Sequence, residues 1–473
     1  MERKSITNTA KFIISTWNIG LFIAVWVAFY NAYAFDFYHL YGGLASSVIY
    51  LIIYLALCNL YKAFRIASTN LGEVIFAQVI SFGIADLILY AECCLINNHI
   101  VNLIPGIITV FLQGIGTIII VIITKRYFIK HVKPKLTYLL YGDRMTEEET
   151  SRFAERLLKK YRHLFDIAFI SPESVAREEF LDTLSQCEVV ILYEISSANR
   201  GEYLKLCMEA QKKFYFTPEI EDLICQGSSY KHLLDTPLMK YDYSYEGKKE
   251  YGIKRVLDLL LSVILLILLS PVFLITALCI KIEDGGPVFY RQERYTKNGR
   301  IFRIIKFRSM VVDAERNGAK PCVGNDSRIT KVGRVIRRSR IDELPQLFNI
   351  LKGDMSFVGP RPERVEHVKQ YTTEMPEFAY RLRVKGGLTG YAQIYGKYNT
   401  SAYDKLRLDL MYIENQSLLT DLKIMMLTFR TIFQPDSTEG FEEDKSASIN
   451  QKAQTEQGDG NQTFDTANSI AKL

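Results

Sequence analysis

The chain lacks the residue spacings that define several common kinds of site. Its eight cysteines form no CxxC pair, and its six histidines show neither HxxxH nor HExxH spacing, which argues against a zinc site. We therefore expect the cysteines to be buried, reduced thiols. The first apolar run has no small-residue cleavage pattern, so we expect a retained anchor rather than a signal peptide.

Long apolar runs are the most prominent feature of the N-terminal part. Apolar residues make up 48% of the sequence, and four runs are long enough to cross a bilayer. They occupy residues 12–35, 41–61, 73–96 and 101–124. Their connectors alternate between basic and non-basic, and basic connectors stay on the cytoplasmic side. The sequence therefore predicts a four-helix transmembrane domain over residues 1–134, with both ends in the cytoplasm.

A fifth apolar run, from Val256 to Ile280, does not follow this pattern. A straight spanning helix would place the basic segment that follows it outside the cell, against the charge rule. Ser270 and Pro271 lie in this run, and a proline breaks or kinks a helix because it removes a backbone donor. A helix–break–helix that enters and leaves the same leaflet satisfies both constraints, with Ser270 bonding the freed carbonyls. A kinked spanning helix is the alternative.

Between the apolar parts, residues 135–250 alternate strand-like and helix-like segments. The expected strands cover residues 136–141, 166–170, 188–193 and 214–216. Such alternation predicts a parallel, Rossmann-like α/β domain. The first turn contains Tyr141, Gly142 and Asp143 instead of a GxGxxG motif. A scaffolding or regulatory role is therefore favoured over dinucleotide binding.

Two adjacent carboxylates, Asp342 and Glu343, follow an arginine-rich stretch. Pro345 is tolerated only in the first turn of a helix, which predicts that Asp342 lies at or near the N-cap of a helix over residues 346–351. Asp is a preferred N-cap residue, so a purely structural role is the alternative. A helix N-terminus attracts phosphate, and a carboxylate there can attack phosphorus. Glu343 would then bind Mg²⁺, which prefers few carboxylates together with substrate phosphates.

Basic residues surround this pair in the sequence. Lys331, Arg334 and Arg337 recur every three residues, so they share one face of a helix. We interpret this face as an anion site rather than a merely solvated surface, because the planar guanidinium group grips phosphate oxygens with two bonds.

Two further segments suggest contacts with a ligand. Residues 301–308 alternate basic and apolar side chains, which predicts a strand whose basic side chains Arg303, Lys306 and Arg308 reach one way. Residues 385–390 are rich in glycine, and we expect a flexible loop that lets the backbone approach a nucleotide.

The segment from about Lys254 to Phe433 resembles the bacterial sugar transferase family, the monotopic polyprenyl-phosphate phosphoglycosyl transferases. The resemblance rests mainly on the 21 residues from Asp342 to Pro362. Shorter matching pieces are residues 254–255, 270–271, 306–310, 388–393 and 421–424. The four upstream helices and the α/β insert resemble the large form of the same family.

The resemblance implies transfer of hexose-1-phosphate from a UDP-sugar to undecaprenyl phosphate, with release of UMP, as the first step of exopolysaccharide, capsule or O-antigen repeat-unit assembly. It implies that Asp342 is the nucleophile, that Glu343 binds Mg²⁺, and that Ser270 and Pro271 form the re-entrant break. The side chains expected to bind substrate are those of Lys306, Arg337, Arg361, Lys397 and Asp421. Lys397 stands where the family often has arginine, so it keeps the charge but loses the planar fork.

The resemblance also sets the expected architecture. A re-entrant helix and a compact, mostly helical catalytic domain would cover residues 251–434, and residues 435–473 form a polar tail expected to be disordered. The expected location is the bacterial inner membrane, with the catalytic domain on the cytoplasmic face.

The expected partners are a UDP-hexose, undecaprenyl phosphate and the bilayer, but no nucleic acid; a homodimer through the upstream part is compatible with the sequence. Glucose and galactose are favoured over N-acetylated sugars by analogy with large forms. The alternative function is a membrane-bound regulatory protein that binds nucleotide or lipid without releasing UMP.

Overall fold

The computed structural model describes residues 2–30, 40–66, 69, 71–242, 249–312, 314, 326–396 and 400–432. Its contacts divide the chain into two compact units, Met1–Glu219 and Ile220–Leu473. The predicted tail at 435–473 lies outside the described residues, as does Cys322. Of the described cysteines, Cys225 and Cys279 are exposed, so the expectation that the thiols are buried is wrong for these two.

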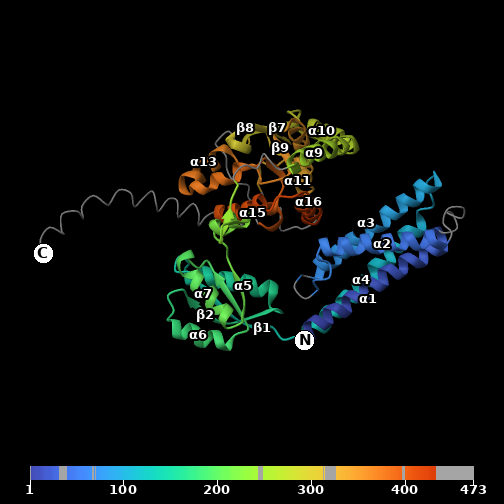
Figure 1. Cartoon of the computed structure of the whole chain (residues 1–473). Helices are drawn as coiled ribbons and strands as arrows, with labels where there is room; N and C mark the ends of the chain where they lie inside the picture. The colour runs from blue at the N-terminus through green and yellow to red at the C-terminus, as the bar shows by residue number, and fades with distance from the viewer. Residues whose placement is uncertain are drawn as a thin grey trace, which may run out of the picture. The chain divides into compact units, whose positions relative to one another are not determined.

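The first unit begins with four long helices (Figure 1). They are α1 (Glu2–Val25, continued by a π-helical turn over Trp26–Tyr30), α2 (Leu40–Leu60), α3 (Leu71–Asn97) and α4 (Ile104–His131). Each is long and apolar enough to cross a membrane, which confirms the four predicted spans. Helix α4 packs against α1 and α3, and α2 packs against α3. Lys125, Arg126 and Lys130, which follow the fourth apolar run, lie in the last turns of α4.

A mixed α/β domain completes the first unit. Its strands are β1 (Lys135–Tyr141), β2 (Phe165–Pro172), β3 (Val189–Tyr193) and β4 (Lys213–Phe216). They form a sheet of order β2-β1-β3-β4 in which every pairing is parallel. The connecting helices are α5 (Glu147–Tyr161), α6 (Arg177–Gln186) and α7 (Ser197–Glu209). Each predicted strand is present within a few residues. Helices α6 and α7 pack in the core around Tyr138 and Val190, and α5 packs in a second cluster around Leu139 and Ile191.

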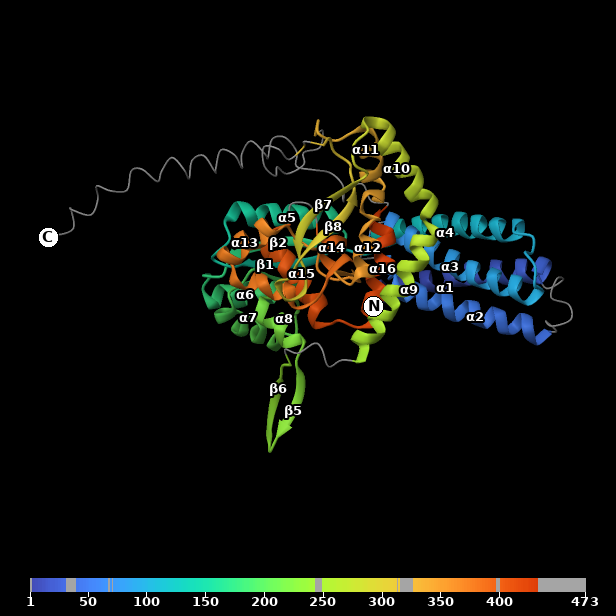
Figure 2. The same cartoon turned by 90° about the horizontal axis from the view of Figure 1, so that it is seen from above.

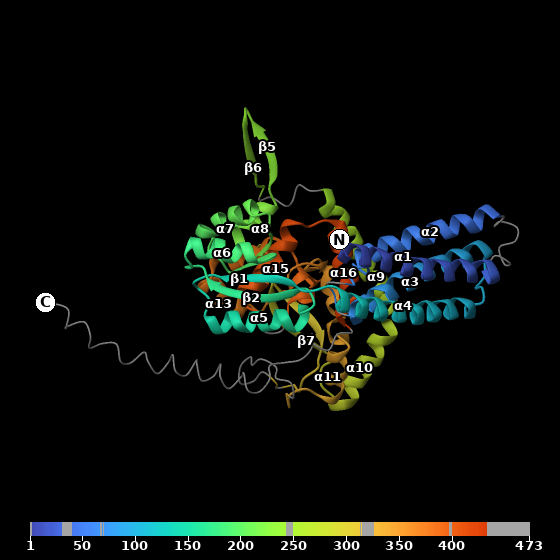
Figure 3. The same ribbon diagram turned by 90° about the horizontal axis from the view of Figure 1, so that it is seen from below.

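The second unit begins before the fifth apolar run. Helix α8 (Ile220–Gln226) buries Ile220 and Leu223 in the core of this unit. Strands β5 (Ser229–Leu233) and β6 (Thr236–Lys240) then form an antiparallel hairpin in which every residue is exposed. Figure 2 and Figure 3 show this hairpin projecting from α8.

The fifth apolar run folds as two helices, α9 (Lys249–Leu268) and α10 (Ser270–Asp284). The helices are bent by 61° at the predicted Ser270–Pro271 break. The Ser270 hydroxyl donates to the carbonyl of Ile267 at 2.8 Å, which satisfies an acceptor near the break. Gly285 ends α10 in the left-handed conformation, with φ of +69°. The break is therefore confirmed, whereas the path through the membrane stays a prediction.

The rest of the second unit is compact and contains more helix than strand. An antiparallel hairpin, β7 (Phe289–Tyr295) and β8 (Ile301–Phe307), precedes helix α11 (Lys331–Arg338). After the carboxylate pair come α12 (Gln346–Lys352), β9 (Met355–Val358), α13 (Val365–Glu374), β10 (Gly386–Thr389), α14 (Tyr391–Tyr395), α15 (Ala402–Glu414) and α16 (Leu418–Ile432). One apolar core, which includes Leu347, Phe357, Leu410 and Ile424, holds most of these elements together. Ile336 of α11 packs instead with Ile280 and Phe307 in a second cluster.

Candidate active site

The carboxylate pair lies in a tight turn that joins α11 to α12. Arg340 adopts the left-handed conformation with φ of +59°, and a 3₁₀ turn, η4 (Ile341–Glu343), follows. Pro345, not Asp342, is the N-cap of α12, and its side chain cannot cap because it lacks an acceptor. Asp342 therefore lies near the N-cap, as predicted, but three residues before it and not at it. The reason is that short i→i+3 bonds, such as Glu343 N to Arg340 O at 3.2 Å, place an extra helical turn ahead of the proline.

Glu343 is held between two cations. Its Oε1 accepts from Lys306 Nζ at 2.9 Å and from Arg361 Nη2 at 2.8 Å. Burial by itself would raise the pKa of Glu343, but Arg361 and Lys306 outweigh burial and hold that pKa well below its usual range. Burial also lowers the pKa of Lys306. Glu343 is thus a permanently ionised carboxylate that gathers positive charge from two other segments of the chain.

Asp342 differs from its neighbour because burial and the charges around it, rather than an ion pair with two cations, set the state of its carboxyl group. Burial, followed by the charge of Glu343, raises the pKa of Asp342 to about 6. Lys306, Arg337 and Arg340 act in the opposite direction. At neutral pH the carboxyl group is therefore mostly ionised, and it carries a negative charge that neighbouring cations only partly offset.

Helix α12 sets the position of Lys306. The Asn349 side chain bonds the edge of β8 twice, accepting from Ile305 N at 2.9 Å and donating to Arg303 O at 2.8 Å. These two hydrogen bonds fix β8 beside the helix that follows Glu343. Lys306 is the next residue of the strand. The prediction that the basic residues of β8 reach one way is wrong. Arg303 pairs with Glu293, because residues three apart in a strand face opposite sides and Arg303 therefore faces away from Lys306. Arg308, just after β8, pairs with Asp284.

Close backbone pairing between residues 359–360 and β10 positions Arg361. Gly359 N donates to Thr389 O at 2.9 Å, and Gly387 N donates to Pro360 O at 2.8 Å. A Cβ on Gly387 would lie 2.1 Å from Gly359 N, so only glycine fits there. The predicted flexible glycine loop is therefore strand β10, paired in parallel with β9. These glycines serve backbone packing that holds the Arg361 turn.

The other predicted substrate-binding residues lie in different surroundings. Arg337 is half-buried near the C-terminus of α11 and acts electrostatically on Asp342. Asp421 pairs with Lys254, and Tyr412 donates to it at 2.8 Å. Its partners among the described residues thus belong to α9 and α15 and not to the carboxylate pair. Lys397 lies outside the described residues. The structure therefore gathers Lys306, Arg337 and Arg361 around the pair, and Asp421 links α16 to α9.

Several residues of the site escaped the sequence analysis. Arg340 lies immediately before the 3₁₀ turn and lowers the pKa of both carboxyl groups. Arg381 is buried and donates from Nη2 to the Arg361 carbonyl at 2.9 Å. Gln393 has both amide atoms buried without a protein partner. The proximity of Arg340 to Asp342 in sequence was a usable signal, whereas the contacts of Arg381 exist only in the folded chain.

The residues present fit a divalent cation only in part. No group of three or more His, Cys, Asp or Glu side chains that could hold a metal occurs in the part of the chain that the structure describes. Asp342 and Glu343 are adjacent carboxylates, and Mg²⁺ is commonly held by one or two carboxylates plus substrate phosphates. One oxygen of Glu343 already binds Lys306 and Arg361. A cation would therefore need substrate oxygens to complete its coordination.

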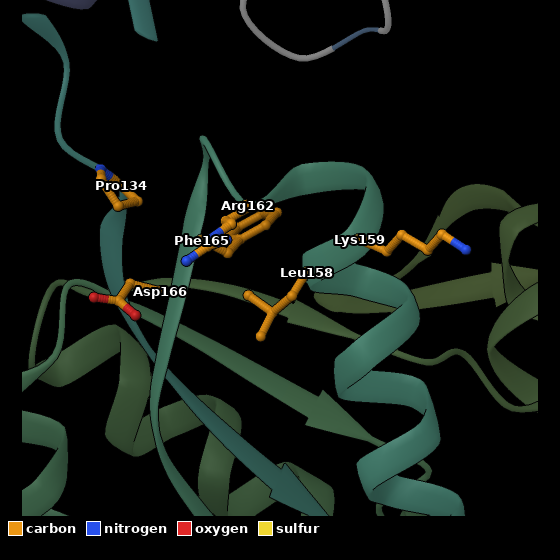
Figure 4. Close-up of a pocket in the computed structure, with 6 residues that line it drawn as sticks. All are labelled: Pro134, Leu158, Lys159, Arg162, Phe165 and Asp166. Atoms are coloured by element: carbon orange, nitrogen blue, oxygen red, sulfur yellow. The ribbon is translucent and has the colours of Figure 1, made fainter. Parts of the chain in front are cut away.

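A separate surface hollow lies in the α/β domain (Figure 4). Its volume is about 530 Å³, and it is lined by Pro134, Leu158, Lys159, Arg162, Phe165 and Asp166. These residues surround the amino ends of β1 and β2. Open parallel sheets bind ligands at the carboxyl ends of their strands, so this hollow is at the opposite edge.

Comparison with known proteins identifies the second unit. A family model described as bacterial sugar transferase matches residues 249–435. A UDP-glucose:undecaprenyl-phosphate glucose-1-phosphate transferase of Caulobacter vibrioides is 40% identical over 189 residues, which are 39% of this chain and 71% of that protein. A sugar transferase of Bacillus subtilis named EpsL and described as uncharacterized is 42% identical over 180 residues, covering 38% of this chain and 87% of that protein. This chain belongs to the bacterial sugar transferase family.

Another relative is matched over a smaller share of its own length. The UDP-N-acetylgalactosamine-undecaprenyl-phosphate N-acetylgalactosaminephosphotransferase of Aeromonas hydrophila is 49% identical over 183 residues. The match covers 38% of this chain and 43% of that protein, so it spans less than half of the relative. Relatives named for glucose and for N-acetylgalactosamine both resemble this chain, and the expected preference for an unacetylated hexose stays a prediction.

Proposed function

We propose that this chain transfers a sugar-1-phosphate from a UDP-sugar to undecaprenyl phosphate and releases UMP. The observation that carries the proposal is the Asp342–Glu343 pair. One carboxylate is neutralised by Lys306 and Arg361, and the other stands ionisable beside Arg337 and Arg340. Cations that converge on such a pair suit a substrate with several phosphate charges.

In the proposed first step, an Asp342 carboxylate oxygen attacks the β-phosphorus of the UDP-sugar. The bond between that phosphorus and the bridging oxygen breaks, and the electron pair leaves with UMP. The product is an acyl phosphate that joins Asp342 to the sugar phosphate. Lys306 and Arg361 would stabilise the charge that develops on the diphosphate oxygens.

In the proposed second step, a phosphate oxygen of undecaprenyl phosphate attacks the same phosphorus. The acyl phosphate bond breaks, so the Asp342 carboxylate is regenerated and the sugar is left on a lipid diphosphate. Glu343 would hold Mg²⁺ together with substrate phosphates, and the ion would neutralise phosphate charge when it is bound. The pKa of Asp342, about 6, leaves the attacking group mostly ionised at neutral pH.

The bent pair α9–α10 supports a placement of this chemistry at the membrane surface. Its 61° bend and apolar exposed side chains suit a helix pair that enters and leaves one leaflet. Such a path would keep the basic catalytic unit in the cytoplasm, at the bacterial inner membrane. Gly252 and Ile282 are exposed sites at the two ends of the pair. Single cysteines there should both be labelled from the cytoplasmic side of intact cells; labelling from opposite sides would establish a spanning helix.

The decisive test of the proposed activity is release of UMP. Full-length protein in bilayers with Mg²⁺ and undecaprenyl phosphate is given UDP-glucose, UDP-galactose, UDP-N-acetylglucosamine and UDP-N-acetylgalactosamine in turn. We expect repeated turnover with at least one donor, and no more than about one equivalent of UMP per protein when the lipid phosphate is replaced by the free alcohol. Binding of a UDP-sugar without UMP release from any donor would refute the proposal and favour the regulatory alternative.

A further inference from the structure

The helix pair α9–α10 contacts both helices that flank the Asp342–Glu343 turn. Helix α11 ends just before the turn, and α12 begins just after it. The start of α9 packs against α12, and α10 packs against α11. The turn that carries the carboxylates is thus suspended between two helices, each held by one arm of the pair.

Arg255 holds the helix that follows the turn. Its Nη1 donates to the Ile350 carbonyl at 2.6 Å, and its Nη2 donates to the Leu351 carbonyl at 2.8 Å. These carbonyls lie in the last turn of α12, where backbone acceptors have no partner within the helix. The guanidinium group also lies at the end of the helix that bears partial negative charge. Arg255 therefore fixes the C-terminus of α12 to α9.

Glu283 holds the helix that precedes the turn. Its Oε1 accepts from Lys331 N at 2.7 Å and from Val332 N at 3.2 Å. These are the first two backbone donors of α11, and Thr330 caps the third at Gly333. The carboxylate faces the end of the helix that bears partial positive charge. Glu283 therefore fixes the N-terminus of α11 to the end of α10.

Apolar contacts join the same parts between these two polar contacts. The Phe273 ring of α10 lies 5.3 Å from the Phe307 ring and 5.9 Å from the Phe348 ring of α12, measured between centroids. Ile341, the residue before Asp342, packs in one cluster with Ile280. The second arm therefore lies against residues on both sides of the carboxylate pair.

We propose that Glu283 and Arg255 are positioning residues, through which the apolar helix pair sets the orientation of Asp342 toward the phosphorus. This inference rests on the proposed function and adds to it a mechanical link between membrane anchor and nucleophile. Attack on phosphorus requires close alignment, and a displacement of about 1 Å can cost about a hundredfold in rate. A loosened α11 would therefore slow chemistry without removing a group that touches substrate.

The proposal predicts a separation of kcat from KM. Asn349 fixes the position of Lys306, and the pairing of β9 with β10 fixes that of Arg361. Neither position depends on Glu283. Glu283→Ala should therefore lower kcat about tenfold to a hundredfold, with KM for the UDP-sugar within about threefold of wild type. Glu283→Gln keeps a side-chain oxygen that accepts from Lys331 N, and it should restore kcat to within about threefold. Glu293→Ala, which removes an exposed carboxylate from the β7–β8 hairpin, is the matched control and should change neither constant.

Hydrogen exchange of the full-length protein supplies a second measurement that needs no activity. In Glu283→Ala, amides of residues 331–333 and of the 341–344 turn should both exchange faster, whereas Glu293→Ala should leave them unchanged. Faster exchange at 331–333 alone, or an unchanged kcat, would overturn the proposal. If Glu283→Ala does not fold, Phe273→Ala tests the same link with the same two measurements. Wild-type protein that releases no UMP would refute the proposed function, and exchange at 341–344 would still decide whether the helix pair holds the turn.

Discussion

Each unit of the molecule contains a carboxylate side chain beside a helix, and the two carboxylates accept hydrogen bonds from different kinds of donor. In the α/β domain, the buried Glu173 side chain accepts from Ser196 N at 3.2 Å, Ser196 Oγ at 2.5 Å and Asn199 Nδ2 at 2.8 Å. All three donors are neutral and belong to the start of α7. In the second unit, Glu343 accepts from the charged groups of Lys306 and Arg361.

The difference indicates at which of the two carboxylate sites a phosphate could bind. Glu173 fills the donors at a helix start near the carboxyl ends of β1 and β3, where parallel sheets commonly bind phosphates. The protein's own carboxylate takes that place, which supports a scaffolding role for the domain. Around Asp342, by contrast, Lys306, Arg337 and Arg340 supply positive charge that would attract an incoming phosphate.

Replacement of the proposed nucleophile is the strongest challenge to this comparison. Asp342→Asn removes the attacking oxygen's charge but keeps the shape of the turn, so UMP release should fall by at least about a thousandfold. The assay is UMP release, together with trapping of a radiolabelled sugar phosphate on the protein in the absence of lipid. Wild-type protein should retain label and the variant should not. Full activity in Asp342→Asn would refute the covalent step.

Local features of the sequence predicted local structure well. The four membrane helices and the alternating strands from Lys135 to Phe216 follow from apolar runs and their periodicity, which depend on neighbouring residues only. The break at Ser270 and Pro271 follows from the covalent structure of proline. These predictions succeed because a few consecutive residues determine the outcome.

Predictions that depended on distant partners were less complete. The sequence predicts Asp342 at or near an N-cap, because the left-handed Arg340 and the extra 3₁₀ turn leave no clear pattern in it. The prediction that Arg303, Lys306 and Arg308 reach one way fails because each pairs with its own carboxylate, and the partner of Lys306 lies 37 residues away. The glycines near Gly387 were read as flexible because their need appears only where β10 crosses Gly359.

The next largest effect should follow from neutralising Glu343. Glu343→Gln leaves Lys306 and Arg361 without their shared carboxylate and removes a proposed Mg²⁺ ligand, so kcat should fall by about a hundredfold. The concentration of Mg²⁺ needed for half-maximal UMP release should also rise. A titration with Mg²⁺ on both proteins measures this shift. An unchanged requirement would show that Glu343 only organises the two cations.

A smaller effect is expected when the fork of Arg361 is lost. Arg361→Lys keeps a positive charge, but an ammonium group cannot bond Glu343 and a phosphate oxygen with a planar pair of donors. We expect kcat/KM for the UDP-sugar to fall by about tenfold. Steady-state kinetics across donor concentrations give this value, and Arg303→Lys, an exposed residue of β8, is the control. An equal loss in both variants would contradict a specific role for Arg361.

The smallest effect on activity should come from replacing Glu173 in the α/β domain. Glu173→Gln replaces an acceptor of three bonds by an amide that must turn one donor toward them, which should weaken the start of α7 by about 1–2 kcal/mol. Hydrogen exchange of residues 196–200 in the full-length protein measures this loss, and Glu188→Gln, an exposed partner of Lys135, is the control. UMP release should stay within about twofold of wild type, because Glu173 belongs to the first unit and the carboxylate pair to the second. A large loss of turnover with an unchanged exchange rate would mean that Glu173 takes part in the reaction, and the contrast between a structural and a chemical carboxylate would fail.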